Sequence, residues 1–473
     1  MLKRRLDLWL PTYLASAPQR AWQRFARAKR TTHLLLLVCD HFEPKHSETA
    51  HQASAAQAVE LIKGWHAGYA TFQQRCRSAF GTAPLHTWFY PPHHGVEALA
   101  NLAAMAHDGL GEVELHYHHE GDTEVTLERD LRAALAEYNR WGLLLESGAA
   151  PRTTFGFIHG DWALGNSGGG RFCGVNDELS ILQKLGCWAD LTMPSGEKYQ
   201  TRKINSLYYG KGHPHHAKAH NWGPDARVGQ SAPEGLMLIQ GPLGINWTAP
   251  SHPRIENASL TSENWGRPDR IGKWIDCNVH VAGRPEWLFV KLHTHGAVER
   301  DFDALFGEKA MHMHRVLNRH YNDGKRYQLH YVTARQAYNI AKAAEHGHAG
   351  NPDDYLDFQV APPATAYYAA NARHILDHCS PARLKMHAFE TGKPVQIRSR
   401  VGPLVRLSGP IGAYDVDVLQ QRIHINACGK VELTFHSAAS AAGAAIVEGG
   451  TSVAQHGPIR QLDIARCCTL SYR

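Results

Sequence analysis

Histidines and acidic residues end three apolar runs of the chain. The runs cover residues 34–41, 112–122 and 287–296. The side chains at their ends are Asp40, His41, His116, His118, His119, His293 and His295. Neutral imidazole and carboxylate oxygen are the usual protein ligands of catalytic zinc, which keeps an open position for water. Imidazoles and carboxylates that converge at strand ends therefore predict a metal-dependent hydrolase.

Asp40 directly follows a short apolar run that is predicted to be a buried strand. A carboxylate at such a place is costly unless it is paired or ligates a metal. We therefore interpret Asp40 as a metal ligand or a general base. The alternative is an aspartate that caps a helix or forms a turn. His41, which stands beside it, is another candidate for the base.

His116, His118 and His119 are the predicted imidazole ligands of a divalent ion, and Zn²⁺ is the ion expected. On a strand, His116 and His118 share one face and His119 lies on the other. If the chain turns helical at residue 118, His116 and Glu120 fall four residues apart instead. Either geometry places two ligands on one ion, with Asp40 as a further ligand. The alternative is a polar strand end with solvated histidines.

A fourth apolar run ends in His159, Asp161 and Trp162. Asp161 is predicted to orient a catalytic water or a histidine, or to act as the base. The glycines that follow, at positions 165 and 168–170, either offer backbone N–H groups to an oxyanion or form a plain loop.

Two further histidine groups have predicted roles. His293 or His295 would protonate a leaving amine, because imidazole titrates near neutral pH; the alternative is a structural histidine. Residues 212–220 form the densest histidine tract, which we interpret as a mobile lid or a substrate contact rather than as a second metal site.

Four residues are predicted to bind the substrate. Trp162, Trp188 and Trp222 could stack on sugar rings, and His159 could contact the same substrate. The alternative for each tryptophan is a place in the hydrophobic core.

Composition limits the class of protein. The chain has 473 residues, 43% of them hydrophobic and 20% charged, which is typical of a globular protein. A formal net charge of +6, with scattered charges, does not indicate a nucleic-acid partner. Nine cysteines without a C-x-x-C pair favour reduced thiols and a cytoplasmic location. A homo-oligomer remains open.

The periodicity predicts three parts. Residues 1–30 form a basic amphipathic arm that either packs on the domain or lies on a membrane surface, such as the inner membrane. Residues 31–350 alternate strands and helices, which predicts an α/β fold with a (β/α)-barrel of about seven strands. Residues 355–473 comprise a linker and a small β-rich accessory domain. The loops 195–235 and 244–285 are expected to cover the barrel mouth.

The order of these parts resembles the polysaccharide deacetylases, the NodB-like carbohydrate esterases of family four. Residues 37–42 stand in place of that family's first, aspartate-rich motif, and residues 113–119 in place of its second, which supplies histidine ligands. Residues 155–162 are placed like its third motif. Residues 178–190 are similar to its stretch of leucine-rich helix, glycine, aromatic residue and aspartate, and residues 288–295 to its last motif.

The resemblance covers about residues 32–345. It implies a deformed barrel that removes an acyl group of the N-acetyl kind from a carbohydrate or polysaccharide, with a divalent metal. The family has two adjacent aspartates in its first motif, whereas this chain has Asp40 followed by His41. The family's two histidines are four residues apart, whereas Glu120 stands four residues after His116. These departures are typical of a divergent branch.

Two alternatives stay open. One is a degenerate, non-catalytic barrel that binds carbohydrate or acts as a scaffold in exopolysaccharide biosynthesis, and the missing second aspartate favours it. The other is a glycoside hydrolase, which needs two carboxylates at the mouth; Asp40 and Asp161 could supply them.

Overall fold

The chain forms two compact units. The computed structural model describes residues 3–27, 30–45, 53–139, 141–146, 152–248, 253–363, 369–370, 374–377, 383–388, 395–399, 402–409, 411–417, 422–427, 429–435, 438–465 and 467–471. The first unit comprises Met1–Ala98, Gly111–Arg132 and Thr154–Val360. The second comprises Leu99–Leu110, Ala133–Thr153 and Ala361–Arg473.

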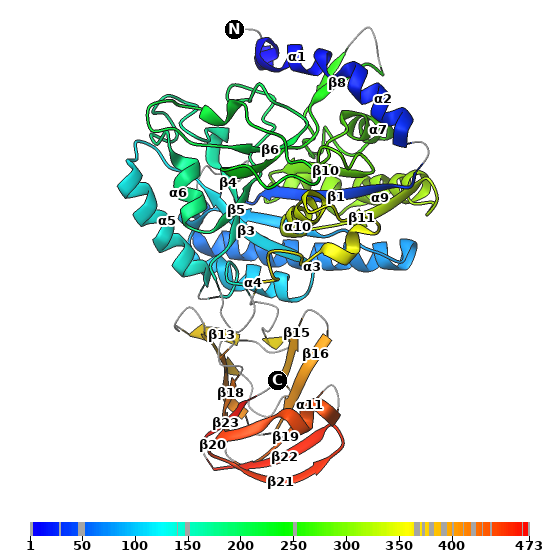
Figure 1. Cartoon of the computed structure of the whole chain (residues 1–473). Helices are drawn as coiled ribbons and strands as arrows, with labels where there is room; N and C mark the ends of the chain where they lie inside the picture. The colour runs from blue at the N-terminus through cyan, green and yellow to red at the C-terminus, as the bar shows by residue number, and fades with distance from the viewer. Residues whose placement is uncertain are drawn as a thin grey trace. The chain divides into compact units, whose positions relative to one another are not determined.

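A nine-stranded sheet is the centre of the first unit (Figure 1). Its strands are β1 (Thr32–His41), β2 (His86–Tyr90), β3 (Gly111–Tyr117), β4 (Phe155–His159), β5 (Cys187–Asp190), β6 (Leu207–Gly210), β7 (Leu236–Ile239), β10 (Trp287–Thr294) and β11 (Tyr327–Tyr331). Their order is β10-β1-β2-β3-β4-β5-β7-β6, and β11 also pairs with β1. Every pair is parallel except β6 with β7. The prediction of an α/β fold is confirmed in this form.

Helices precede and connect these strands. They are α1 (Leu6–Ala15), α2 (Ala17–Arg27), α3 (Ala55–Phe80), α5 (Glu124–Asn139), α6 (Glu178–Lys184), α7 (Pro268–Cys277), α8 (Phe302–Leu305), α9 (Glu308–Tyr321) and α10 (Ala334–Glu345). Short 3₁₀ turns lie at Lys3–Arg5, Pro92–His94, Val96–Ala98, Gly160–Trp162, Ala219–Asn221, Glu299–Asp301 and Pro352–Tyr355. Capping boxes fix the starts of α3 and α10, where Ser54 and Thr333 each accept a hydrogen bond from the backbone three residues on.

Strand β1 shows why the sheet is buried. Leu35, Leu37 and Cys39 belong to one core cluster, which includes residues of α10. The intervening Leu34, Leu36 and Val38 belong to another, which includes residues of α7 and α9. Successive side chains of a strand point to opposite faces, so a strand covered on both faces must be apolar throughout. The parallel arrangement then brings the polar strand ends to one edge.

The N-terminal arm packs against the first unit through α1. Trp9 and Tyr13 are buried and form a cluster with Ile204 and Leu243. Helix α2, by contrast, exposes the side chains of Trp22 and Phe25. Among the helices in the described part of the chain, none has both the length and the apolar character needed to cross a bilayer.

The second unit contains helix α4 (Leu99–His107), helix α11 (Ala438–Gly443) and two antiparallel sheets of six strands. One sheet has β12 (Ala369–Ala370), β15 (Val395–Ser399), β16 (Gly402–Ser408), β19 (Gly429–Phe435), β22 (Ile459–Ile464) and β21 (Thr451–His456). The other has β13 (His374–Asp377), β14 (Arg383–Ala388), β17 (Ile411–Asp417), β18 (Arg422–Ala427), β23 (Cys467–Ser471) and β20 (Ala445–Glu448). The predicted C-terminal β-rich region is therefore present.

The two long loops predicted in the first unit contain regular elements. Strand β6 lies within 195–235, while α7 and the hairpin of β8 (Gly244–Asn246) and β9 (Arg254–Glu256) lie within 244–285. The strands are only three or four residues long, too short for a clear period of two. Tertiary pairing, rather than local pattern, defines them.

A buried ion pair ties α10 to β3. The Arg335 guanidinium donates to Glu112 at 3.0 Å and to Asp357 at 2.7 Å, and the side chains of Arg335 and Glu112 are both buried. Removal of one partner leaves an uncompensated buried charge. We expect Arg335→Ala to lower the free energy of unfolding by about 3–5 kcal/mol in urea denaturation.

Arg132→Ala is the matched control, because Arg132 forms an exposed pair with Glu128 at 2.7 Å. Water and salt screen such a pair, so this variant should unfold at the urea concentration of the parent chain. A similar decrease in the free energy of unfolding in both variants would contradict the stabilising role of the buried ion pair.

Candidate metal centre

Side chains from the ends of β1 and β3 converge. Glu43, His116 and His118 each bring one ligand atom within 4.8 Å of the other two. Nε2 of His118 lies 2.9 Å from Oε1 of Glu43 and 3.0 Å from Nε2 of His116. Nε2 of His116 lies 3.7 Å from the same Glu43 oxygen. We call these three residues the open cluster.

The hydrogen bonds of the two histidines identify which ring nitrogens carry protons. Nδ1 of His116 lies 2.9 Å from the Ile158 carbonyl oxygen, and Nδ1 of His118 lies 3.2 Å from a carboxylate oxygen of Asp161. Carbonyl and carboxylate oxygens only accept, so both Nδ1 atoms donate. In neutral rings, the two Nε2 lone pairs then face each other and Glu43. A cation is needed between them, either an added proton or a metal ion.

The spacing suits a metal ion. Tetrahedral zinc ligands at about 2.0–2.1 Å from the ion lie about 3.3 Å from one another, and the three separations here range from 2.9 to 3.7 Å. Two histidines and one glutamate, with a fourth position for water, are a ligand set of catalytic zinc. The side chains of His118 and Asp161 are 26% and 43% exposed, so solvent reaches this cluster.

Further aromatic rings surround the open cluster. The ring centroid of His41 lies 4.9 Å from that of His116, 5.0 Å from that of His295 and 5.5 Å from that of Trp162. His41 is buried, and its Nε2 has no hydrogen-bond partner among the described residues. Nε2 of His295 lies 3.9 Å from Oε2 of Glu43. These residues could bind substrate or transfer protons beside the cluster.

Electrostatics favour positive charge at the open cluster. Burial by itself lowers the pKa of His118, but hydrogen bonds to Asp161 and Glu43 outweigh it and raise that pKa to about 9. His41 behaves in the opposite way, because burial and the neighbouring histidines hold its pKa well below the usual value. The open cluster thus attracts a cation, whereas the His41 ring stays neutral.

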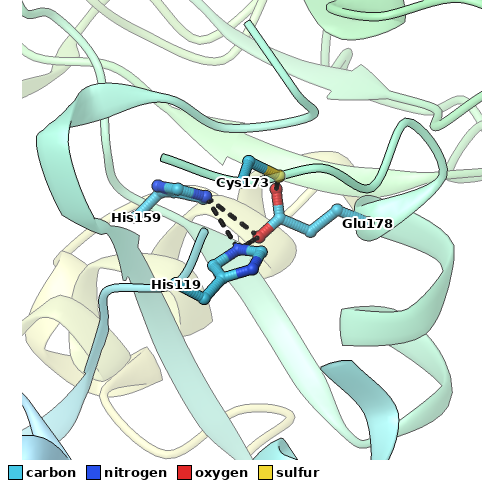
Figure 2. A group of neighbouring side chains, drawn as sticks. All are labelled: His119, His159, Cys173 and Glu178. Carbon is cyan, nitrogen blue, oxygen red and sulfur yellow. Dashed lines mark hydrogen bonds and ion pairs between the residues drawn. The ribbon is translucent and has the colours of Figure 1, made fainter. Parts of the chain in front are cut away.

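A second group of ligand-type side chains lies on the other side of the β3 end. His119, His159, Cys173 and Glu178 also bring one ligand atom each within 4.8 Å of one another (Figure 2). Nε2 of His119 lies 3.0 Å from Nε2 of His159 and 3.2 Å from Oε1 of Glu178. His159, Cys173 and Glu178 are buried, and the side chain of His119 is only 3% exposed. We call them the buried cluster.

The structure separates the predicted imidazole ligands as strand geometry predicts. His116 and His118 lie in the open cluster, and His119 lies in the buried cluster. His159, predicted to bind substrate, joins His119 instead. The described residues do include clusters that could hold a metal ion, but these form two groups rather than one, and Asp40 belongs to neither.

Asp40 does not join either group. Its side chain is fully buried, with Oδ2 at 2.8 Å from Nε2 of His86 and Oδ1 accepting from the Gly296 backbone at 2.5 Å. Its carboxylate is therefore paired, which is the other way to relieve the cost of burial. In this position Asp40 connects β1 to β2 and to the chain after β10.

Other predicted residues lie elsewhere. His293 is buried in β10, and its ring centroid is 6.3 Å from that of His41. Trp188 is buried in the core, where its ring centroid lies 5.1 Å from that of Tyr338. Trp222 is exposed and lines a different cavity of about 440 Å³, together with residues of the N-terminal arm. The structure does not bring these three side chains to the open cluster.

The histidine tract also stays outside both clusters. His213 and His216 are exposed, with ring centroids 4.3 Å apart. His220 is buried beside Gly165, and neither of its ring nitrogens has a hydrogen-bond partner in the described part of the chain.

Three site residues were missed from the sequence. Glu43 follows Asp40 by three positions, so the sequence does place a second acidic residue near the end of this strand. Asp40 was predicted as the carboxylate ligand because it directly follows the apolar run. Glu178 begins α6, where an acidic residue is ordinary because it complements the helix dipole. Cys173 follows a run of glycines and has no partner nearby in sequence.

A scan against protein-family models found no match, and a search of curated proteins found no significant match.

Gly160 provides a test of the open cluster that removes no ligand atom. A Cβ atom at this position would lie 2.4 Å from Cγ and 2.5 Å from Nδ1 of His118, so the ring must move. We expect Gly160→Ala to weaken zinc binding at the open cluster by at least about tenfold, as for lost outer partners of metal ligands. Competition with a chromophoric chelator measures this affinity.

The control is Gly64→Ala in α3, where an added Cβ would meet nothing within 4 Å. This variant should bind zinc as the parent chain does. Unchanged zinc affinity in Gly160→Ala would mean that His118 does not hold the ion.

Proposed function

We propose that the chain is a metal-dependent hydrolase that removes an acyl group, of the N-acetyl kind, from a carbohydrate or polysaccharide. The observation that carries this proposal is the open cluster: two imidazole lone pairs and a carboxylate facing one position that solvent can reach. Glu43, His116 and His118 would hold the ion, and Zn²⁺ suits this ligand set.

The arrangement of strands supports the proposed barrel. Strands β1 to β5 are neighbours in chain order, and β10 pairs with β1 on its other side. Consecutive parallel strands are how a singly wound barrel is built, with its site at the carboxyl ends. The resemblance to NodB-like deacetylases adds the expected reaction. Glu43 replaces Asp40 as the carboxylate ligand in this proposal.

A divalent ion at the open cluster would polarise the scissile carbonyl and lower the pKa of a bound water. Asp161 accepts from Nδ1 of His118 and so holds that ring with Nε2 toward the cluster. The ring of His41 is neutral, and its Nε2 has no hydrogen-bond partner among the described residues, so this nitrogen could accept a proton from the water. His295, which is partly exposed beside Glu43, could donate a proton to the leaving amine.

Trp162 completes the substrate side of the proposed site. Its ring centroid lies 6.0 Å from that of His295. Trp162 and the preceding Asp161 both adopt positive φ, at 55° and 53°. Non-glycine residues in this region are strained, and such strain concentrates at functional sites. An aromatic face here suits a sugar ring.

The location and the partners of the chain remain predictions. A cytoplasmic location, a homo-oligomer and contact with the inner membrane through residues 1–30 belong to this proposal. The exposed Trp22 and Phe25 of α2, near Arg24, would suit an anionic membrane surface.

Acetate release from N-acetylglucosamine oligomers by the zinc-loaded chain tests the proposal. Glu43→Gln should reduce kcat/KM at least about 100-fold, since even outer partners of metal ligands cost roughly 10- to 100-fold. Glu120→Gln is the control, because Glu120 is exposed and lies outside both clusters. It should retain activity.

Other outcomes separate the alternatives. New reducing ends without acetate would indicate a glycoside hydrolase, and bound zinc without either product would indicate a carbohydrate-binding or scaffold role. Full activity in Glu43→Gln would exclude the open cluster as the reaction centre.

A further inference from the structure

The buried cluster has the features of a second, independent metal site. Each histidine points Nε2 toward the centre, and each uses Nδ1 elsewhere. Nδ1 of His119 lies 3.0 Å from Oδ2 of Asp122, and Nδ1 of His159 lies 2.5 Å from the Gly160 carbonyl oxygen. Both partners only accept, so the Nε2 atoms of neutral rings present lone pairs to each other at 3.0 Å. Figure 2 shows both rings directed at Glu178.

The hydrogen-bond acceptor behind His119 is itself fixed by a further hydrogen bond. Asp122 accepts a hydrogen bond from Thr126 Oγ1 at 2.6 Å, which orients the carboxylate behind His119. A carboxylate or carbonyl behind each ligating histidine is the usual support of a protein zinc site. Glu178 places Oε1 at 3.2–3.3 Å from both Nε2 atoms, while its Oε2 accepts from the Gly165 backbone at 2.7 Å. One carboxylate oxygen therefore remains for an ion.

Cys173 supplies the fourth ligand atom. Its Sγ lies 3.7 Å from Oε2 of Glu178 and 3.6 Å from the Val175 carbonyl oxygen. This Sγ lies within 4.8 Å of a ligand atom of each of the other three residues, and zinc–sulfur and zinc–oxygen bonds of about 2.3 and 2.0 Å put such ligands about 3.5 Å apart in a tetrahedron. The three other ligand separations, 3.0–3.3 Å, match tetrahedral nitrogen and oxygen ligands equally well.

Burial distinguishes this cluster from the open one. The side chains of His159 and Glu178 are 0% exposed and that of His119 is 3% exposed. Four protein ligands without solvent access are typical of a structural zinc site, whereas a catalytic site keeps a position for water.

We propose that His119, His159, Cys173 and Glu178 form a closed, structural zinc site, separate from the open cluster. Its ligands come from the ends of β3 and β4, from the glycine-rich segment after β4, and from the first residue of α6. The ion would join the two ends of residues 159–178. Asp161, which accepts from His118 of the open cluster, and Trp162, whose ring lies beside that of His41, are both within that segment.

This site does not depend on the proposed hydrolase activity. It would fix the backbone at residues whose positive φ is unfavourable for non-glycine side chains, among them Asn166 and Phe172 at 56° and 62°. The dense packing of Gly174 agrees with this, since an added Cβ would lie 2.6 Å from the Asp122 carbonyl oxygen.

Cobalt(II) is the probe that separates the two clusters. Among the cluster residues only Cys173 carries sulfur, so a thiolate-to-cobalt charge-transfer band in the near ultraviolet reports on the buried cluster alone. We expect the metal-free full-length chain to bind two cobalt ions and to show this band. Cys173→Ala should lose the band and one ion, whereas Glu43→Gln should keep the band and lose the other ion.

Cys277→Ala is the matched control. Cys277 is equally buried, and its Sγ also lies 3.6 Å from a carbonyl oxygen, that of Leu243. This variant should keep both the ions and the band. If Cys173→Ala does not fold, Cys173→Ser serves instead: its oxygen can ligate, so the ion stays and the band disappears. Absence of the band in the parent chain, or its persistence in either Cys173 variant, would overturn the proposal.

Discussion

The structure depends on the convergence of imidazole lone pairs at the end of β3. His116 and His118 on one side, and His119 with His159 on the other, all commit Nδ1 to an acceptor and direct Nε2 at a second Nε2. Such groups repel unless a cation lies between them. The carboxylates of Glu43 and Glu178 also attract a cation to each cluster. Both clusters could therefore hold a cation, and the surrounding fold positions their ligand atoms.

The sheet supplies the required geometry. Both faces of β1 are buried in apolar side chains, so the polar residues that follow it can lie only at its carboxyl end. Parallel pairing of β1, β2, β3 and β4 puts these ends at one edge. Just beyond Tyr117, where β3 ends, His118 joins the open cluster and His119 joins the buried one. Gly160 fits between them because only a residue without Cβ leaves room for the His118 ring.

Much of this could be predicted from the sequence. The apolar residues of β1, β3 and β10 indicated the strands, and the histidines that end them indicated candidate ligands. The separation of His119 from His116 and His118 agrees with the strand alternative, in which His119 lies on the opposite face, although β3 itself ends at Tyr117. What could not be predicted depends on contacts distant in sequence: Asp40 pairs with His86 and Gly296, while Glu43, three residues later, faces the histidines. Likewise, Cys173 and Glu178 join His119 across more than fifty positions.

We propose that both clusters hold metal ions rather than extra protons. Anomalous diffraction from a zinc-grown crystal, recorded on both sides of the zinc absorption edge, tests it most directly. We expect two strong anomalous peaks from zinc. One should lie between Glu43, His116 and His118, and the other should be enclosed by His119, His159, Cys173 and Glu178. Density for bare, hydrogen-bonded imidazoles with no anomalous peak at either position would contradict it.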